Sequence, residues 1–531
     1  MTTHTLRALV RSWFGGPRWR VGPVPERPHT VLLGWSGDLL SILPELVEPD
    51  PDQRRDGLAV LADRDPAVMA GEVRDRVGPG GSPRVGCRRG DPADPDEIAR
   101  LHLDRARSVI ILPAADTPAD RDAHLVKALL AVSRVAGAPP AARVVGKVSD
   151  PANLPAARLA GGPQVHLVDG TGLVARLIVQ ACRQPGLPLV CAGLLGPGGP
   201  GIHIREEPAL VGHTYRQAVH AYRQAAVIGL QAADGEITLN PHSQTPIAPG
   251  DRVIAIAPEL TALVPAPAPA PITQPAILAN PDPPPSRART LVLGWNARAA
   301  RVLGQLDLQL PPGSEVSVVA RHPGVVPELG QLTSQLRNLV LTFKEDDGGD
   351  RAVLESLGVD GYHHVLVLAD DQVGRPLADA RVLTTQLHLW DLAQQPGTGQ
   401  FSVVCELADH RTAGLARITG TEDVVAGEWL VNLLLARIAG EPTQGLVYAN
   451  LFDPDGSALH LKPAGQYVQT GQPANFQTVV EAARWRWETA IGYRVAAQAH
   501  QPPGFGVVLN PDKAAPLTLE PDDRVIVLAE T

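Results

Sequence analysis

The sequence predicts an α/β protein built by tandem duplication, in which a doubly wound parallel-sheet domain followed by a small α+β module occurs twice. Two observations point to this fold class. Residues 30–36 read TVLLGWS and recur as TLVLGWN at 290–296. Continuous runs of Val, Ile, Leu and Ala also alternate with helix-like segments, and such runs are typical of strands buried on both faces of a parallel sheet. The 531 residues leave room for three or four domains.

The repeat continues through the later elements of each copy. The GW strand precedes a helix-like segment, DLLSILPEL in the first copy and ARAARVLGQL in the second. The next matching strands are SVIILPAAD (108–116) with HVLVLADDQ (364–372), and ARVVGKVSD (142–150) with FSVVCELAD (401–409). Near the end of each copy, ITLNPHSQTPIAPGDRVIAIA (237–257) matches VVLNPDKAAPLTLEPDDRVIVLA (507–529). The Pro-Gly-Asp and Pro-Asp-Asp turns before the last strands indicate hairpins in the small modules.

These patterns divide the chain into six predicted segments. They are an N-terminal tail (1–28), a first nucleotide-binding-type domain (29–184), its C-terminal module (185–258), a Pro/Ala-rich linker (259–288), a second nucleotide-binding-type domain (289–441) and its C-terminal module (442–531). Alternating Pro and Ala in the linker disfavour helix and sheet, so we expect a semi-rigid, extended connector. The tail is either a frayed end or a short amphipathic segment that rests on a membrane or a partner.

Composition excludes some functional classes. A net charge of -9 argues against a nucleic-acid partner, which requires a concentrated basic surface. The four cysteines form no CxxC pair and have no histidine at zinc-ligand spacing, so we expect reduced, packed thiols. The longest apolar stretches reach about half of the roughly 18 residues that a membrane span needs. The chain is therefore predicted to be soluble and cytoplasmic.

The first candidate site lies where the first strand of the first copy meets the following helix. A dinucleotide-binding fold places G-x-G-x-x-G here, because glycine permits a tight turn and a close approach to a pyrophosphate at a helix N-terminus. The three positions hold Gly34, Ser36 and Leu39, and Trp35 follows the one retained glycine. Ser36 could cap the helix and present backbone N–H groups to an anion. Phosphate or nucleotide binding thus stands beside a purely structural strand-to-helix turn.

Two carboxylates are expected at the same edge of this sheet. Asp63 ends the second strand, where an acidic side chain can bind a ribose diol. Asp91 lies in the turn after the third strand, in RRGDPADPDEIARL, where Asp94 can cap the next helix. Ligands of such folds bind at the carboxyl ends of the strands. The alternative for Asp91 is a turn-stabilising role.

The second copy offers an equivalent site with different chemistry. Gly294, Trp295, Asn296 and Ala299 stand at the strand-to-helix turn, and Arg321 ends the second strand in place of an acid. Because an aspartate suits a diol and an arginine suits a phosphate, the two copies are expected to bind different ligands if both bind one. Neither copy shows an evident His, Lys or Tyr arrangement for acid–base catalysis, so an enzyme is not expected.

Two further patterns are less specific. An acidic run could ligate Ca²⁺, but it lacks the EF-hand spacing, so we expect solvated loop acids. It comprises Glu345, Asp346, Asp347 and Asp350. Trp485 and Trp487 alternate in RWRW, which puts both on one face of an extended segment and predicts core or interface packing.

Taken together, these motifs resemble the regulator of K⁺ conductance (RCK) domains, and more closely the Castor/Pollux family of ion channels. The GW that replaces the glycine fingerprint is similar to that family, as are LGWNARAARVLGQLDLQLPPGSEV, RLIVQACRQPGLP (176–188) and LNP followed by GDRVIAIA. The resemblance extends from about residue 29 to the end of the chain.

The resemblance implies a gating ring of tandem RCK domains, in which four chains contribute eight domains around a cation pore. It implies NAD(H) or an adenine nucleotide, and Ca²⁺, as candidate ligands, and a membrane K⁺ or Ca²⁺ channel or transporter as the partner. The family's membrane helices are not found in this sequence, so the expected location is the cytoplasm, with peripheral contact at the inner face of the membrane. The alternatives are a stand-alone nucleotide sensor, a scaffold without a ligand, and, least favoured, an NAD(P)-dependent enzyme.

Overall fold

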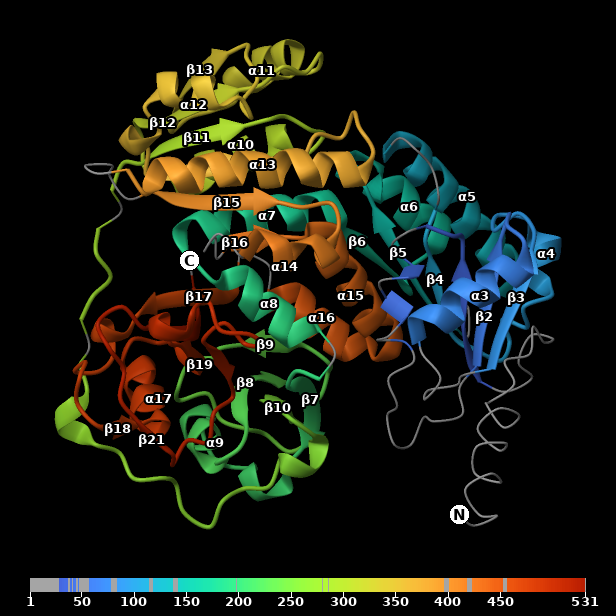
Figure 1. Ribbon diagram of the computed structural model, residues 1–531. Coiled ribbons are helices and arrows are strands. Elements are labelled where there is room, and N and C mark those ends of the chain that lie inside the picture. The colour runs from blue at the N-terminus through green and yellow to red at the C-terminus, as the bar shows by residue number, and fades with distance from the viewer. Residues whose placement is uncertain are drawn as a thin grey trace, which may run out of the picture. The chain divides into compact units, whose positions relative to one another are not determined.

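The structure, a computed structural model, describes residues 28–530 apart from 37–38, 41, 44–45, 47–56, 78–83, 114–117, 137–141, 197, 279, 285, 396–400, 418–422 and 452–455. It separates into two compact units (Figure 1). The first unit holds the chain up to residue 171 together with 431–445, and the second holds 172–430 together with 446–531. Residues 1–27 of the N-terminal tail, with its two interpretations, lie outside the described residues.

A six-stranded parallel sheet forms the centre of the first unit. Its strand order is β3-β2-β1-β4-β5-β6, which places the point where the connections reverse direction between β1 and β4. The strands are β1 (His29–Leu33), β2 (Gly57–Ala62), β3 (Arg84–Arg89), β4 (Ala106–Ile111), β5 (Arg143–Val148) and β6 (Val165–Asp169). The helices between them are α3 (Pro66–Val77), α4 (Pro95–Ala99), α5 (Pro118–Ala136) and α6 (Leu154–Gly161). All six residues of β2 are buried, as a strand covered on both faces requires.

The second unit contains a sheet of the same topology, β13-β12-β11-β14-β15-β16, again wholly parallel. Its strands are β11 (Arg289–Leu293), β12 (Ser314–Val319), β13 (Leu339–Lys344), β14 (His364–Val367), β15 (Ser402–Glu406) and β16 (Asp423–Val425). Its helices are α10 (Ala299–Gln309), α11 (Val325–Thr333), α12 (Arg351–Leu357), α13 (Arg375–Ala393) and α14 (Ala413–Ala416). The two sheets confirm the predicted duplication of a doubly wound domain.

Equivalent polar contacts recur in the two domains. On α5, the buried Asp122 carboxylate accepts the backbone N–H groups of Ser149 and Asp150, at 2.7 and 2.8 Å. On α13, the buried Asp379 carboxylate accepts those of Ala408 and Asp409, at 2.7 and 3.1 Å. Each carboxylate therefore satisfies the two backbone groups that follow the fifth strand, which ties this turn to the long helix.

The C-terminal modules also confirm the predicted α+β fold, and both lie in the second unit. Their antiparallel sheets have matching orders, β7-β10-β8-β9 and β17-β22-β19-β20. The strands are β7 (Gly201–Glu206), β8 (Ala226–Gln231), β9 (Ile237–Leu239) and β10 (Arg252–Ala257), then β17 (Ser457–Pro463), β19 (Thr489–Arg494), β20 (Val507–Leu509) and β22 (Arg524–Glu530), with β18 (Ala474–Asn475) and β21 (Pro516–Leu517) as a small pair. Helices α9 (Tyr215–Ala221) and α17 (Phe476–Trp485) belong to the first and second module. Buried residues of both modules form one continuous hydrophobic cluster, so the modules are packed as a pair (Figure 1).

Four helices connect the parallel-sheet domains to these modules. They are α7 (Gly170–Arg183), α8 (Leu187–Leu195), α15 (Gly427–Gly440) and α16 (Pro442–Leu451). Their grouping crosses the sequence repeat, because residues 431–445 of the second copy belong to the first unit, whereas α8 of the first copy lies beside β16 and β20 in the second unit. The Gly186 N–H that precedes α8 donates to the buried Asp423 carboxylate at 2.7 Å. The helices that connect domain and module in each copy are therefore divided between the two units.

The Pro/Ala-rich linker is bonded along its length to the C-terminal modules. The Ala266 N–H donates to the Ala221 carbonyl at 2.7 Å, and the Leu278 N–H donates to the Tyr467 carbonyl at 2.7 Å. The Asp282 carboxylate accepts Lys462 Nζ at 2.7 Å. The sequence predicts a semi-rigid connector, and the structure adds that this segment forms hydrogen bonds to both modules.

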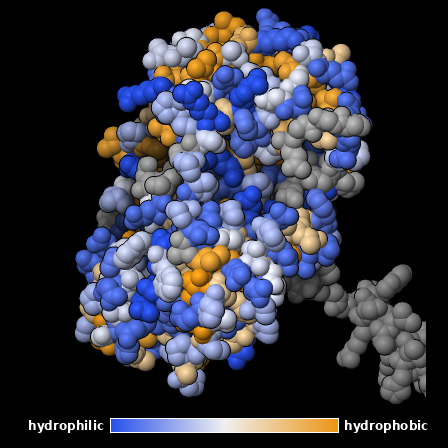
Figure 2. All heavy atoms as spheres, turned by 90° about the vertical axis from the view of Figure 1, so that its left-hand side faces the viewer, coloured by the Kyte–Doolittle hydropathy of each residue, from blue (hydrophilic) through white to orange (hydrophobic). Residues whose placement is uncertain are grey.

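Within the described ranges, every helix is too short or too polar to cross a membrane. Hydrophilic residues cover most of the face shown in Figure 2, and the hydrophobic residues on it form small separate groups. All four cysteines are buried and unpaired with one another, as the sequence predicts.

Candidate functional site

The first predicted site is a cleft of about 860 Å³ at the carboxyl ends of β1 to β4. Gly34, Trp35, Asp63 and Asp91 all line it, although they come from three different strand ends. This is the edge and the strand pair at which doubly wound sheets bind ligands. Ser36 is the one predicted residue of the first copy that is not among the lining residues.

The retained glycine has a steric reason. Gly34 has φ +104°, and a Cβ on it would lie 2.1 Å from the carbonyl oxygen of Leu112. Both facts exclude a larger residue, because L-residues rarely adopt this conformation and the neighbouring backbone leaves no space. Gly294 repeats the arrangement, with φ +87° and a distance of 2.8 Å to the Leu368 oxygen. The close approach of two neighbouring parallel strand ends thus explains the glycine, with or without a ligand.

Basic side chains surround the first cleft, and the sequence reasoning missed them. The Arg64 guanidinium lies 5.2 Å from the Trp35 ring centroid. Arg89 pairs with Asp63 at 3.0 Å, between two well-exposed side chains. Lys127 and His124 reach the cleft from α5. The signal was available, since Arg64 and Arg89 stand at the ends of the second and third strands and Lys127 follows His124 at helical spacing.

Asp91 stabilises its turn and also lines the cleft. Its Oδ1 accepts the Ala93 N–H at 2.8 Å, which is a turn-stabilising contact. Its Oδ2 accepts Lys127 Nζ at 2.9 Å at the cleft. The hydrogen bond from Lys127, supported by that from Ala93, holds the pKa of the Asp91 carboxyl below its usual value. Asp94 caps α4 by accepting the Asp96 N–H, as predicted.

The second predicted site is a cleft of about 610 Å³ in the second unit, lined by Gly294, Trp295 and Arg321. The Trp295 indole is buried, and its Nε1 donates to the Glu328 carboxylate at 3.2 Å. Asn296 does not line this cleft. It is 1% exposed, so its side chain lies in the interior beside the cleft residues Gly294 and Trp295, and a role in holding an anion stays a prediction.

The amide group that a phosphate would need in the second cleft already has a partner. The Ala297 N–H donates to the Asp371 carboxylate at 2.8 Å. Asn296 Oδ1 accepts the Arg298 N–H at 2.9 Å, so this residue does cap the turn. The first copy has Ala115 at the position that matches Asp371, and alanine carries no carboxylate. The two copies therefore differ in sequence at this position, and in the second copy Asp371 occupies an amide that a phosphate at a helix N-terminus would need.

A buried ion network also fixes this turn in the second copy. Arg298 pairs with Glu406 at 2.6 Å and with Glu428 at 3.0 Å. The Glu406 carboxylate additionally accepts Asn296 Nδ2 at 2.7 Å. Burial alone would lower the pKa of Arg298, but the two glutamates together raise it, so the guanidinium stays charged. Such a network is costly to break, because any remaining charge is buried without compensation.

The acidic run after β13 shows no metal geometry. Asp346 lies 3.2 Å from Lys344 and 3.7 Å from Arg321. Hydrogen bonds from the Asp347 backbone and from Lys344 lower the pKa of the Asp346 carboxyl. Among the described residues, no group of three or more His, Cys, Asp or Glu side chains is arranged to hold a metal ion.

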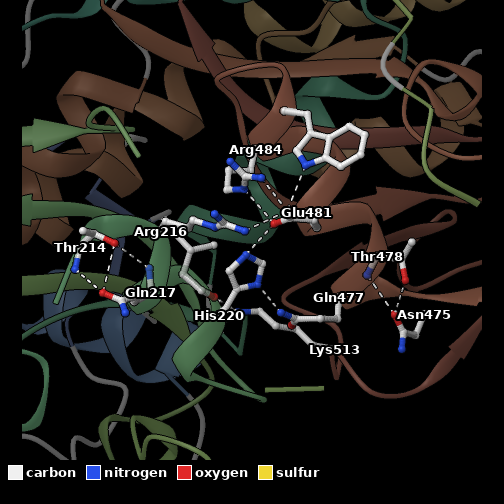
Figure 3. Close-up of polar contacts among 12 residues, drawn as sticks. Thr214, Arg216, Gln217, His220, Asn475, Gln477, Thr478, Glu481, Arg484 and Lys513 are labelled. Atoms are coloured by element: carbon white, nitrogen blue, oxygen red, sulfur yellow. Dashed lines mark hydrogen bonds and ion pairs between the residues drawn. The ribbon is translucent and has the colours of Figure 1, made fainter. Parts of the chain in front are cut away.

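A third polar cluster, which sequence reasoning did not find, joins the two C-terminal modules (Figure 3). Its centre is the nearly buried Glu481 carboxylate on α17, which accepts His220 Nε2 at 2.9 Å and Arg484 Nη2 at 2.6 Å. Burial would raise the pKa of Glu481, but hydrogen bonds from Arg484, His220 and Trp485 lower it. His220 lies on α9, 261 positions earlier, so no local pattern could reveal the pair.

His220 and Glu481 occupy equivalent positions in the two copies. Each stands six residues after the residue that caps its helix, Thr214 in α9 and Asn475 in α17. The buried Lys513 lies next to this pair, and its Nζ donates to the Val219 carbonyl at 2.6 Å (Figure 3). The matching position of the first copy holds Ser243.

The repeated Leu-Asn-Pro motif serves the same pairing of modules. Asn240 and Asn510 have φ values of +47° and +48°. Asn240 Nδ2 donates to the Trp487 carbonyl, and Asn510 Nδ2 donates to the Gln224 carbonyl, each at 2.8 Å. Each asparagine therefore reaches from its own module to the backbone of the other, which explains why both copies keep it.

The chain is similar in sequence to proteins described as ion channels. Residues 171–272 match the family described as Castor and Pollux, part of voltage-gated ion channel. The ion channel CASTOR of Lotus japonicus is 29% identical over 509 residues, covering 89% of this chain and 59% of that protein. The probable ion channel POLLUX of Arabidopsis thaliana is 26% identical, covering 96% and 65%. The chain thus spans less than two thirds of the length of these relatives.

The fold is also found in a solved structure. The gating ring of human SLO3 superposes with a TM-score of 0.66 at 12% identity, over 94% of this chain and 99% of that one. At this identity the likeness concerns the fold alone, and it agrees with the tandem arrangement of parallel-sheet domains and small modules. The resemblance to the Castor/Pollux family that the sequence motifs predicted is therefore confirmed over nearly the whole chain.

Proposed function

We propose that this chain is a regulatory part of a membrane cation channel or transporter and that it binds NAD(H) or an adenine nucleotide in the first cleft. The observation that carries the nucleotide assignment is the cleft at the ends of β1 to β4, with Asp63 at its rim and Arg64, Arg89 and Lys127 around it. An acid suits a ribose diol, and the three basic side chains suit phosphates.

The proposal assigns no nucleotide to the second cleft. Arg321 lies on its rim, but the Ala297 amide is already bonded to Asp371, and Asn296 and Arg298 are held by Glu406. In this proposal the first copy binds the nucleotide and the second copy binds none. Ca²⁺ is also left out, because Asp346 of the acidic run is paired with Lys344.

The channel assignment rests on the relatives, which are described as ion channels, and on the gating-ring fold. In this proposal, four chains contribute eight parallel-sheet domains to a ring at the inner face of the membrane, and the pore conducts K⁺ or Ca²⁺. A ligand changes the ring only as far as its affinity differs between the ring's conformations. The relatives also favour a regulatory role over an enzymatic one.

Isothermal titration of the purified chain with NAD⁺, NADH, ATP and ADP tests the cleft. We expect at least one of them to bind and Asp63→Asn to weaken that binding about tenfold, the loss expected when one charged hydrogen bond to a hydroxyl is removed. Arg321→Gln, at the matching position of the second cleft, should leave the affinity unchanged. Absence of binding by all four, or a loss confined to Arg321→Gln, refutes the assignment.

Native mass spectrometry of the same protein tests the ring separately. We expect a four-chain assembly, and a strict monomer at every concentration contradicts it. Because ligand binding and assembly are measured independently, failure of one leaves the other standing.

A further inference from the structure

A second kind of cavity lies in the second unit and shares no lining residue with either predicted cleft. It has a volume of about 490 Å³, within the usual range for small-molecule sites. Its walls come from α8, from the stretch around α14 and the start of α15, and from the loop before β20. The site therefore joins residues of the first copy, the second parallel-sheet domain and the second C-terminal module.

Two aromatic side chains, Trp429 and Phe505, belong to its lining. The Trp429 ring is stacked on His410, with centroids 5.0 Å apart and an interplanar angle of 10°. Phe505 enters from the loop before β20 and has φ +50°. A positive φ in a phenylalanine is strained and is kept only where the surroundings demand it. The structure thus keeps an aromatic face at this position against a conformational cost.

Arg417, a cation that lines the cavity, makes no ion pair with the residues that the structure describes. Arg417 lies over the Phe505 ring, with its guanidinium carbon 4.6 Å from the centroid. Its Nε is buried and has no hydrogen-bond partner, and no hydrogen bond or ion pair joins the guanidinium to any residue that the structure describes. Burial lowers the pKa of Arg417. An uncompensated, half-buried charge is unfavourable, and an anion bound beside it would remove the penalty.

We propose that this cavity binds a small aromatic anion, whose flat body lies against Trp429 and Phe505 and whose carboxylate, sulfonate or phosphate group pairs with Arg417. Aromatic faces accept a planar apolar body, and a guanidinium recognises an oxyanion by charge-assisted hydrogen bonds. The site is independent of the first cleft, which lies in the other unit. Its occupant would touch three parts of the second unit at once and would bias their arrangement.

Two dyes with the same skeleton and different charge provide the probe. 1-Anilinonaphthalene-8-sulfonate carries the anion, and N-phenyl-1-naphthylamine is its neutral counterpart. Their binding to the full chain is followed by dye fluorescence. We expect Arg417→Met to weaken binding of the sulfonate about tenfold, the effect of one lost charge-assisted contact, and to leave the neutral dye within about twofold. Arg252→Met, which removes an exposed arginine on β10, is the matched control and should change neither.

A second variant tests the cavity itself without altering its charge. Ala192 on α8 lines the site, and Ala192→Phe should fill it and abolish saturable binding of both dyes. Circular dichroism establishes that each variant is folded. The proposal fails if Arg417→Met binds the sulfonate as wild type does, if it loses both dyes equally, or if Ala192→Phe is folded and still binds them.

Discussion

Lys513 offers a quantitative test of how the two C-terminal modules are held together. Its side chain is 1% exposed, and its ammonium donates to the Val219 carbonyl of the other module. Burial lowers the pKa of Lys513 from 10.5 to about 7. Because the unfolded chain keeps the higher value, it binds more protons than the folded chain between pH 7 and 10.5. Stability should therefore rise with pH through this window and be lowest below it.

The size of the effect follows from these two values. One pKa unit corresponds to ~1.36 kcal/mol, so burial of this lysine lowers the free energy of unfolding by about 4 to 5 kcal/mol at pH 6. At pH 9, where the buried lysine has lost its proton, the reduction is about 2 kcal/mol. Lys513→Met removes this penalty at both values but also removes the bond to Val219, at a cost of about 1 to 2 kcal/mol that does not depend on pH. Relative to wild type, the variant should gain about 2 to 3 kcal/mol more at pH 6 than at pH 9.

Urea unfolding at pH 6 and pH 9, followed by tryptophan fluorescence, measures this difference. Trp485 and Trp487, two of the eight tryptophans, belong to the same module as Lys513 and contribute to this signal. Midpoints are compared because a chain of several domains need not unfold in one step. Lys344→Met, at a half-exposed lysine, is the control and should show no such dependence. Equal effects of Lys513→Met at the two pH values would refute the reasoning.

Two further pairs of substitutions test the backbone geometry and the contacts between modules. Gly34→Ala should destabilise the first unit by about 2 kcal/mol or more, because of its positive φ and the contact with Leu112, whereas Gly71→Ala in α3, with no atom near the new Cβ, should stabilise by ~0.5–1 kcal/mol in thermal unfolding. Asn510→Ala should cost ~1 kcal/mol in the same assay, because it removes one hydrogen bond between modules, and Asn240→Ala should cost ~2 kcal/mol, because it removes two, to the Trp487 carbonyl and from the Thr489 hydroxyl. Wild-type stability of either variant would show that its asparagine does not hold the modules together.

Sequence reasoning located the parallel sheets and the first cleft because both depend on local order. Uninterrupted apolar strands and the retained glycine specify the end of β1, and the connectivity then brings Asp63 and Asp91 to the same edge. Arg64 and Arg89 also stand at strand ends, so the same rule brings these basic residues to the cleft.

Sequence reasoning failed where the contact partner is distant or the backbone leaves its regular path. Trp485 and Trp487 do not lie on one extended face. Trp485 ends α17, Trp487 has φ +61°, and both are exposed, so they do not pack in a core. The interface part of the prediction agrees with the Trp487 ring, which stacks on His242 of the first module with centroids 4.7 Å apart. The burial of Asn296 was not predicted, because its partner Glu406 comes from a strand more than a hundred positions later.

The contact between His220 and Glu481 has a consequence for symmetry. An interface between two identical modules must be self-complementary, so a residue on its axis meets its own copy, and a glutamate there would face a glutamate. Because both modules belong to one chain, the two positions could diverge into a base and an acid that need each other. The pair of modules is therefore asymmetric, with the base on the first module and the acid on the second. A protein that binds across this pair meets different side chains on the two modules.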